Sequence, residues 1–227
     1  MPTERPNGLC PYVRLMPAVG SETLVLERGN VTSARRFSQA ISEGDGISII
    51  ALVSDPDGAR AAEEQGAEAL VLDRPVEGVR DATALPVLWR PHGSPREAQS
   101  AEADACVLSV APLEDDDGEL ERLHSEALEL GLECVVEVGE EEELELALQR
   151  IDPEIFLLAS DSDGGDGQSL DRALDLLPDV PAGKLAIAEV ERVARDDVAE
   201  LERAGMDAVI VRAGNIAELT GEPPPEV

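Results

Sequence analysis

From residue 132 to residue 151 the sequence is LECVVEVGEEEELELALQRI, and this stretch contains one complete repeating unit of the fold. Its first part, Leu132–Val138, is rich in β-branched and apolar residues, which is typical of a buried strand. Its second part, Glu140–Ile151, spaces leucine and alanine among glutamates, which is typical of an amphipathic helix with acidic residues in its first turn. We therefore predict a strand followed directly by a helix.

The same strand-and-helix unit recurs along the chain from about residue 46. The predicted strands are Ile47–Val53, Ala67–Asp73, Leu85–Arg90, Ala105–Val110, Leu132–Val138, Ile155–Ala159, Lys184–Val190 and Met206–Arg212. The predicted helices are Asp57–Gly66, Val79–Ala82, Glu97–Ala103, Asp117–Gly131, Glu140–Ile151, Ser169–Leu177, Arg195–Gly205 and Ile216–Leu219. Strands that alternate regularly with helices indicate a parallel sheet.

A closed (βα)₈ TIM barrel of the α/β class is the architecture that this alternation predicts. Nothing in the sequence indicates the reversal of strand order that an open sheet would need, and closure leaves no strand edge unpaired. Residues 1–45 are predicted to be an N-terminal extension with an amphipathic stretch at Val31–Ile41, residues 46–220 the barrel, and residues 221–227 a tail. The length of 227 residues fits a single barrel domain.

The composition describes a strongly acidic protein. Lys and Arg number 18 against 49 Asp and Glu, the formal net charge is −31, and Lys184 is the only lysine. Such a surface repels nucleic acid and acidic membranes, so neither is an expected partner. The three cysteines have no CxxC spacing, no secretory pattern begins the chain, and no apolar run reaches the roughly 18 residues of a membrane span. We expect a cytoplasmic protein, and leave its oligomeric state open.

Two acidic residues are the candidate catalytic groups, because TIM barrels carry their active sites at the carboxyl ends of the strands. Glu137 lies at the end of the fifth predicted strand and Glu189 at the end of the seventh. A carboxyl group partly buried beside apolar barrel walls can act as a general acid or base. The alternative is that both are ordinary solvated acids in a chain that has many.

Other polar residues after the strands give weaker signals. A glycine and an asparagine after the eighth strand, in Arg212-Ala213-Gly214-Asn215, are a weak indication of a phosphate site. Aspartates after the sixth strand could hold a divalent cation, but they have no histidine partners, and we predict no metal and no cofactor. The remaining polar strand ends are Ser54 and Asp55, Asp73 and Arg74, and the aspartates after the sixth strand, Asp161, Asp163 and Asp166.

Several segments resemble one enzyme family. They are Ala67–Asp73, Leu85–Arg90, the acid-bearing fifth strand with its run of glutamates at Leu132–Glu143, and Ala204–Val211. From about residue 36 to about residue 215, the strand order and helix lengths are similar to those of indole-3-glycerol-phosphate synthase. Members of that family are TIM barrels that close the pyrrole ring of a carboxyphenylamino-deoxyribulose phosphate, with loss of CO₂ and water, in tryptophan synthesis.

The resemblance implies a carbon–carbon lyase that acts on a small phosphorylated sugar-amine. Glu137 matches the strand-five acid of the family, and Glu189 matches its strand-seven acid. The chain departs from the family at other strand ends. It has Arg90-Pro91-His92 in place of a Lys-Asp-Phe sequence after strand three, and no lysine in the segment Ala51–Asp55 after strand one.

Further departures follow the last three strands. The chain has Ala159-Ser160-Asp161 where the family has an asparagine, Val190-Glu191 where it has Ser-Gly, and Arg212-Ala213-Gly214 where it has Gly-Glu-Ser. Three hypotheses remain open. The chain is a divergent member of the family with altered chemistry, a catalytically inactive barrel that serves as a binding or assembly partner, or a different barrel enzyme acting on a small phosphate.

Overall fold

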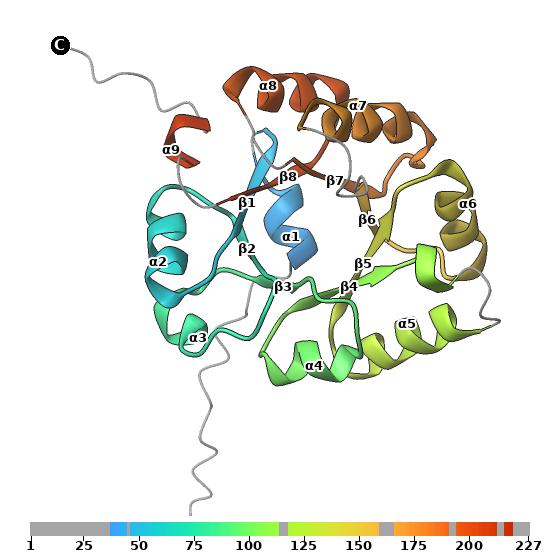
Figure 1. Ribbon diagram of the computed structural model, residues 1–227, viewed down its shortest axis with the longest axis horizontal. Coiled ribbons are helices and arrows are strands. Elements are labelled where there is room, and N and C mark those ends of the chain that lie inside the picture. Colours follow the sequence, from blue (N-terminus) through green and yellow to red (C-terminus); the bar gives the residue numbers. More distant parts are fainter. Residues whose placement is uncertain are drawn as a thin grey trace, which may run out of the picture. The chain divides into compact units, whose positions relative to one another are not determined.

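Eight parallel strands follow one another around a closed barrel, which confirms the predicted TIM barrel (Figure 1). Each strand pairs with its neighbours in the chain, and β1 pairs with β8 to close the sheet. This computed structural model describes residues 37–44, 46–113, 118–158, 166–190, 194–212 and 216–219. The strands are β1 (Ser48–Leu52), β2 (Ala69–Leu72), β3 (Val87–Trp89), β4 (Ala105–Ser109), β5 (Glu133–Val138), β6 (Ile155–Leu158), β7 (Leu185–Glu189) and β8 (Ala208–Arg212).

Helices form a ring outside the strands (Figure 1). They are α2 (Pro56–Glu64), α3 (Val79–Ala82), α4 (Pro95–Ser100), α5 (Glu119–Glu129), α6 (Glu141–Arg150), α7 (Asp166–Leu176), α8 (Arg195–Ala204) and α9 (Ile216–Leu219). Short 3₁₀ turns lie at Ala111–Leu113 and Leu177–Asp179. Each predicted helix is present, with ends that differ by a few residues. Within the described part of the chain, no helix has the length and apolar character needed to cross a membrane.

Three helices, α2, α4 and α7, begin earlier than predicted, and in the first two a proline occupies the first turn. In α4 the side chain of Ser94 accepts a hydrogen bond from the Arg96 backbone N–H, and Pro95 takes the first helical position. In α2 the Asp55 carboxylate accepts from the Gly58 N–H at 2.7 Å. Proline fits the first turn of a helix because its missing N–H would have no partner there.

The alternation of side chains along the strands divides the core into two layers. One apolar cluster contains strand residues such as Val136 together with helix residues such as Leu120 and Leu144, so it fills the space between the barrel and the helices. The other contains Val135 and Ile187 and fills the barrel lumen. Both faces of every strand are therefore buried, which is expected of a parallel barrel.

Helix α1 (Phe37–Ser42) belongs to the lumenal cluster through Phe37 and Ile41, whose side chains are almost completely buried. The Ser38 backbone N–H and hydroxyl both donate to the carboxylate of Glu133, the first residue of β5. The Ser48 hydroxyl, at the start of β1, donates to the Ile41 carbonyl at 3.2 Å. Helix α1 therefore closes the amino-terminal end of the barrel, and Figure 1 shows it in the middle of the strand ring.

The predicted N-terminal extension, residues 1–45, is described only at its end. Helix α1 is the last part of the predicted amphipathic stretch, and it packs into the barrel. The earlier residues and the predicted tail at 221–227 lie outside the described residues. The proposed domain boundaries therefore stay a prediction.

Candidate active site

Both predicted catalytic acids face the lumen at the carboxyl end of the barrel. Glu137 follows the lumenal Val135 by two residues in β5, and Glu189 follows the lumenal Ile187 by two residues in β7. Side chains two residues apart in a strand share a face, so each glutamate lies above an apolar layer. Glu137 is in register with Leu157 of β6, which is in register with Ile187. Glu189 therefore lies two strands away from Glu137, and two residues closer to the carboxyl-terminal end of the barrel.

Glu137 contacts an imidazole from another strand end. His92 lies in the loop after β3, and its Nε2 atom is 2.6 Å from Oε2 of Glu137. The Glu137 side chain is 14% exposed, whereas that of His92 is 56% exposed. The carboxylate is thus mostly enclosed, with an imidazole on its solvent side that can exchange protons with it.

Glu189 contacts a guanidinium group that reaches across the lumen. Arg90 comes directly after β3 and follows the lumenal Leu88 by two residues, so its side chain points inward. Its Nη1 atom is 2.5 Å from Oε1 of Glu189, and the side chains are 30% and 19% exposed. Strands β3 and β7 lie on opposite sides of the closed barrel. The ion pair therefore places a positive charge inside the ring, because a guanidinium stays protonated in proteins.

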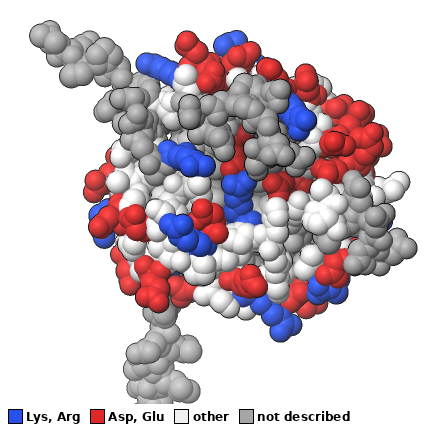
Figure 2. Space-filling view, in the orientation of Figure 1, with Lys and Arg blue, Asp and Glu red and all other residues white. Residues whose placement is uncertain are grey.

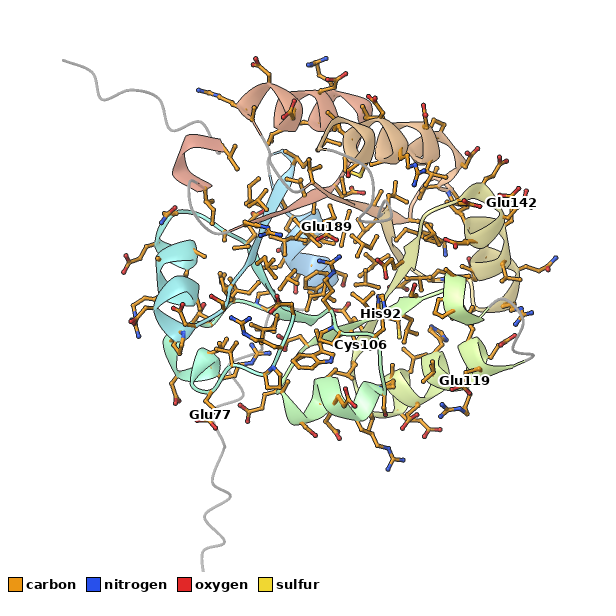
Figure 3. The ribbon with its side chains drawn as sticks, viewed as in Figure 1. Glu77, His92, Cys106, Glu119, Glu142 and Glu189 are labelled. Atoms are coloured by element: carbon orange, nitrogen blue, oxygen red, sulfur yellow. The ribbon has the colours of Figure 1, made fainter. Side chains whose placement is uncertain are left out.

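The figures show the same arrangement. In Figure 3, His92 and Glu189 lie near the middle of the ring, whereas Glu77, Glu119 and Glu142 lie at its outer edge. Figure 2 shows basic side chains in the middle of this face, beside acidic ones, with many acidic side chains around the periphery. The centre of the face thus contains both signs of charge.

Two carboxylates, one imidazole and one guanidinium are sufficient for proton transfer beside a developing negative charge. A carboxylate or an imidazole can donate or accept a proton, whereas a guanidinium stabilises an anion without giving up its proton. The apolar lumenal layer below them lowers the local dielectric constant and strengthens these interactions. These four side chains, here called the lumenal rim, provide the groups that general acid–base chemistry uses.

The other sequence candidates that the structure describes do not join this group. Asp55 caps helix α2, and its neighbour Ser54 is exposed. Asp73 and Arg74, after β2, are exposed as well. Of Asp166 the structure describes only the backbone, at the start of α7. The remaining candidates lie outside the described residues: Asp161, Asp163, Glu191, Ala213, Gly214 and Asn215. Among the residues that the structure does describe, no cluster of three or more His, Cys, Asp or Glu side chains could hold a metal ion.

Arg90 and His92 are the site residues that the sequence did not identify. In sequence they stood out only as a departure from the family's Lys-Asp-Phe. One signal was available for Arg90, because it continues the alternation of the third strand and follows Leu88 by two residues. No such signal existed for His92, whose position depends on the path of the loop after β3.

A family model named indole-3-glycerol phosphate synthase matches residues 95–215. Two relatives carry the same name: one from Nocardioides sp. is 39% identical over 122 residues, and one from Variovorax paradoxus is 36% identical over 115 residues. Each alignment covers 51% of this chain and 43% or 42% of the relative. The chain therefore matches less than half the length of these relatives.

Solved structures with a similar fold include mutant forms of the tryptophan synthase alpha-subunit from the hyperthermophile Pyrococcus furiosus. Two of them superpose with a TM-score of 0.57 and cover 78% of this chain and 98% of their own. The sequence identity is 14%, so this likeness shows the barrel fold alone.

Proposed function

This chain belongs to the indole-3-glycerol phosphate synthase family, and from that membership we propose that it is a carbon–carbon lyase acting on a phosphorylated sugar-amine in tryptophan synthesis. The observation that carries the proposal is the rim itself. Glu137 and Glu189, which match the two family acids, both face the lumen, and each lies within hydrogen-bond distance of a basic side chain.

Arg90 supplies the positive charge that the reaction needs. Ring closure with loss of CO₂ and water develops negative charge on a carbonyl oxygen, which two carboxylates alone would not stabilise. Arg90 takes the place of the family's strand-three lysine, and its guanidinium lies in the lumen beside Glu189. Because a guanidinium keeps its proton, Arg90 stabilises charge here, and a different group must act as the acid.

The glutamates carry the proton transfers in this proposal. Glu137, hydrogen-bonded to His92, can pass a proton between the enclosed lumen and solvent, since His92 is the more exposed partner. Glu189 acts as the second acid or base once the ligand takes its place beside Arg90. One substrate molecule then yields one indole product, one CO₂ and one water.

Separate substitutions of the two acids test this proposal. Glu137→Gln and Glu189→Gln preserve side-chain size but remove the carboxylate, and each should lower turnover by about 10²–10⁴-fold, the range typical of a lost general acid or base. Turnover is measured by the fluorescence of the indole product formed from the phosphorylated sugar-amine. The matched control is Glu142→Gln, since Glu142 is an exposed acid on α6 at the outer edge of the ring.

Unchanged turnover in both lumenal variants would refute the assignment of the two acids. Absence of product with the unmodified protein would refute the lyase function itself. Either result can be interpreted only after circular dichroism has shown that the variants are folded.

A catalytically inactive barrel that serves as a binding or assembly partner is the second candidate. One observation favours it: both acids already have basic partners, as they would in a purely structural ion-pair network. In that case Glu137→Gln and Glu189→Gln lower the thermal midpoint, and the unmodified protein neither turns over the sugar-amine nor binds inorganic phosphate in calorimetric titration. Phosphate binding would favour an enzyme.

A further inference from the structure

Two cysteines lie side by side on neighbouring strands, away from the lumenal rim. Cys106 of β4 and Cys134 of β5 are direct register partners. Both belong to the apolar cluster between the barrel and the helices, so their side chains point outward from the same face of the sheet. Both are free thiols, and neither takes part in the proposed reaction. Figure 3 marks Cys106 on its strand.

Their spacing suits a disulfide. Neighbouring strands lie about 4.7–4.9 Å apart, which is inside the Cα–Cα range of about 4.4–6.8 Å seen for disulfides. Because the strands are parallel and in register at these positions, the two Cβ atoms project in the same direction. The two sulfur atoms therefore lie on directly paired residues and on the same face of the sheet.

A pocket leads to this pair from the surface. It has a volume of about 650 Å³, and Cys134 lines it together with His124 and Leu132. The two thiols are otherwise buried, with 2% exposure for Cys106 and 8% for Cys134. Small molecules can therefore approach the pair from the side of Cys134, the cysteine that lines the pocket.

The two thiols differ in acidity. The neighbouring Cys134 thiol lowers the pKa of Cys106, although burial opposes this change. The interaction with Cys106 and burial raise the pKa of Cys134. Cys106 is therefore the more acidic thiol of the pair. Because the thiolate is the reactive form of cysteine, the attack is assigned to Cys106.

We propose that Cys106 and Cys134 form a reversible dithiol–disulfide site that reacts with hydrogen peroxide or another small hydroperoxide. The Cys106 thiolate attacks a peroxide oxygen and becomes a sulfenic acid, and hydroxide leaves and takes up a proton to form water. The Cys134 sulfur then displaces the sulfenic hydroxyl as a second water. In total, two thiols and one hydrogen peroxide give one disulfide and two waters. A dithiol reductant restores both thiols by exchange. This site does not depend on the proposed lyase function.

The test uses the whole chain with Cys10→Ser, so that the two barrel thiols are the only ones left among the three cysteines of the sequence. After treatment with hydrogen peroxide, the intact mass should fall by two hydrogen atoms and the count of free thiols in denaturant should fall from two to none. A non-reducing peptide map should link the segments that contain Cys106 and Cys134. Dithiothreitol should restore the starting mass.

Single-thiol variants test the order of the steps. In Cys10→Ser with Cys134→Ser, Cys106 cannot be resolved, so a sulfenic acid should accumulate and be trapped by dimedone. The matched control, Cys10→Ser with Cys106→Ser, should trap much less. If serine disturbs folding at these buried positions, alanine replaces it, and the main experiment, which leaves both thiols intact, does not depend on either variant.

Four results would overturn the site. They are two thiols that persist after treatment, oxygen added to Cys106 or Cys134 in the peptide map, a disulfide between two chains, or a loss of circular dichroism that accompanies oxidation. The last result would mean that the thiols react only in unfolded protein.

Discussion

Arg90 places a positive charge at the lumenal rim, because its long side chain extends across the barrel to Glu189. It is 99 residues from Glu189 in sequence, yet their side chains meet inside the barrel. A guanidinium held at this point compensates one of the two acids and leaves the other to His92. At the scale of the residue, Arg90 therefore reduces the repulsion that two carboxylates in one apolar lumen exert on each other.

Asp207, the residue just before β8, makes the free energy of unfolding depend on pH. Its carboxylate accepts a hydrogen bond from the Ala186 N–H at 2.7 Å. Burial raises the pKa of Asp207, and the hydrogen bonds from Ala186 and from its own backbone oppose this only in part. A raised pKa means that folding favours the protonated form. The resulting stabilisation is complete below the pKa of the unfolded chain and is lost as pH rises through the higher pKa of the folded protein.

Asp207→Asn removes this titration and keeps an oxygen that can accept from Ala186. We expect the variant to gain stability relative to the parent as pH rises from about 3 to about 7, because the cost of a half-buried carboxylate is absent. Urea denaturation at a series of pH values measures the difference. Asp171→Asn, at an exposed position on α7, is the matched control. The same pH dependence in both variants would contradict the prediction.

Helix α1 shows how an element outside the strand-and-helix repeat completes the barrel. It has six residues, which is too short for a helix to be stable alone, so its packing must hold it in place. Phe37 is fully buried in the lumenal cluster, and Ser38 ties the helix to the start of β5. The amino-terminal end of the lumen is thereby closed, while the carboxyl end carries the polar rim.

Phe37→Ala tests the importance of this closure. Truncating a fully buried phenylalanine typically costs about 3–5 kcal/mol of unfolding free energy, through lost apolar contacts and the cavity left behind. We expect a loss in this range in urea denaturation. Gln39→Ala, on the exposed side of the same helix, should stay within about 0.5 kcal/mol of the parent. Equal effects of the two substitutions would show that α1 does not support the core.

The whole molecule combines an apolar interior with a strongly acidic exterior. With 49 acidic and 18 basic residues, the net repulsion among surface charges opposes the compact state. Ion pairs along the surface helices, such as those of Arg122 with Glu119 and Glu126, compensate only locally. The apolar clusters on both faces of the barrel must outweigh this repulsion.

Added salt should therefore stabilise this protein. Raising sodium chloride from about 0.01 M to about 0.5 M shortens the Debye length from roughly 30 Å to a few ångströms, which screens repulsion across the surface. We expect the thermal unfolding midpoint to rise over this range. Potassium chloride should act equally, because screening depends on ionic strength. A falling midpoint would contradict the prediction, and an effect of only one cation would indicate specific binding instead.

The sequence by itself determined the barrel, the order of its strands and the end of the barrel at which Glu137 and Glu189 lie. These features depend on local periodicity, since alternation within a strand and amphipathic spacing within a helix involve residues close together in the chain. The helices that begin at Pro56, Pro95 and Asp166 were predicted to begin slightly later in the chain.

Only the tertiary structure decided which groups meet. The contacts of Arg90 with Glu189 and of His92 with Glu137, the register of Cys106 with Cys134, and the closure of the lumen by α1 all join distant segments. Such contacts depend on how far each strand is staggered against its neighbours and on the path of the loops. Neither property is encoded in the periodicity of any single segment, so the partners of the two acids became visible only once the barrel had closed.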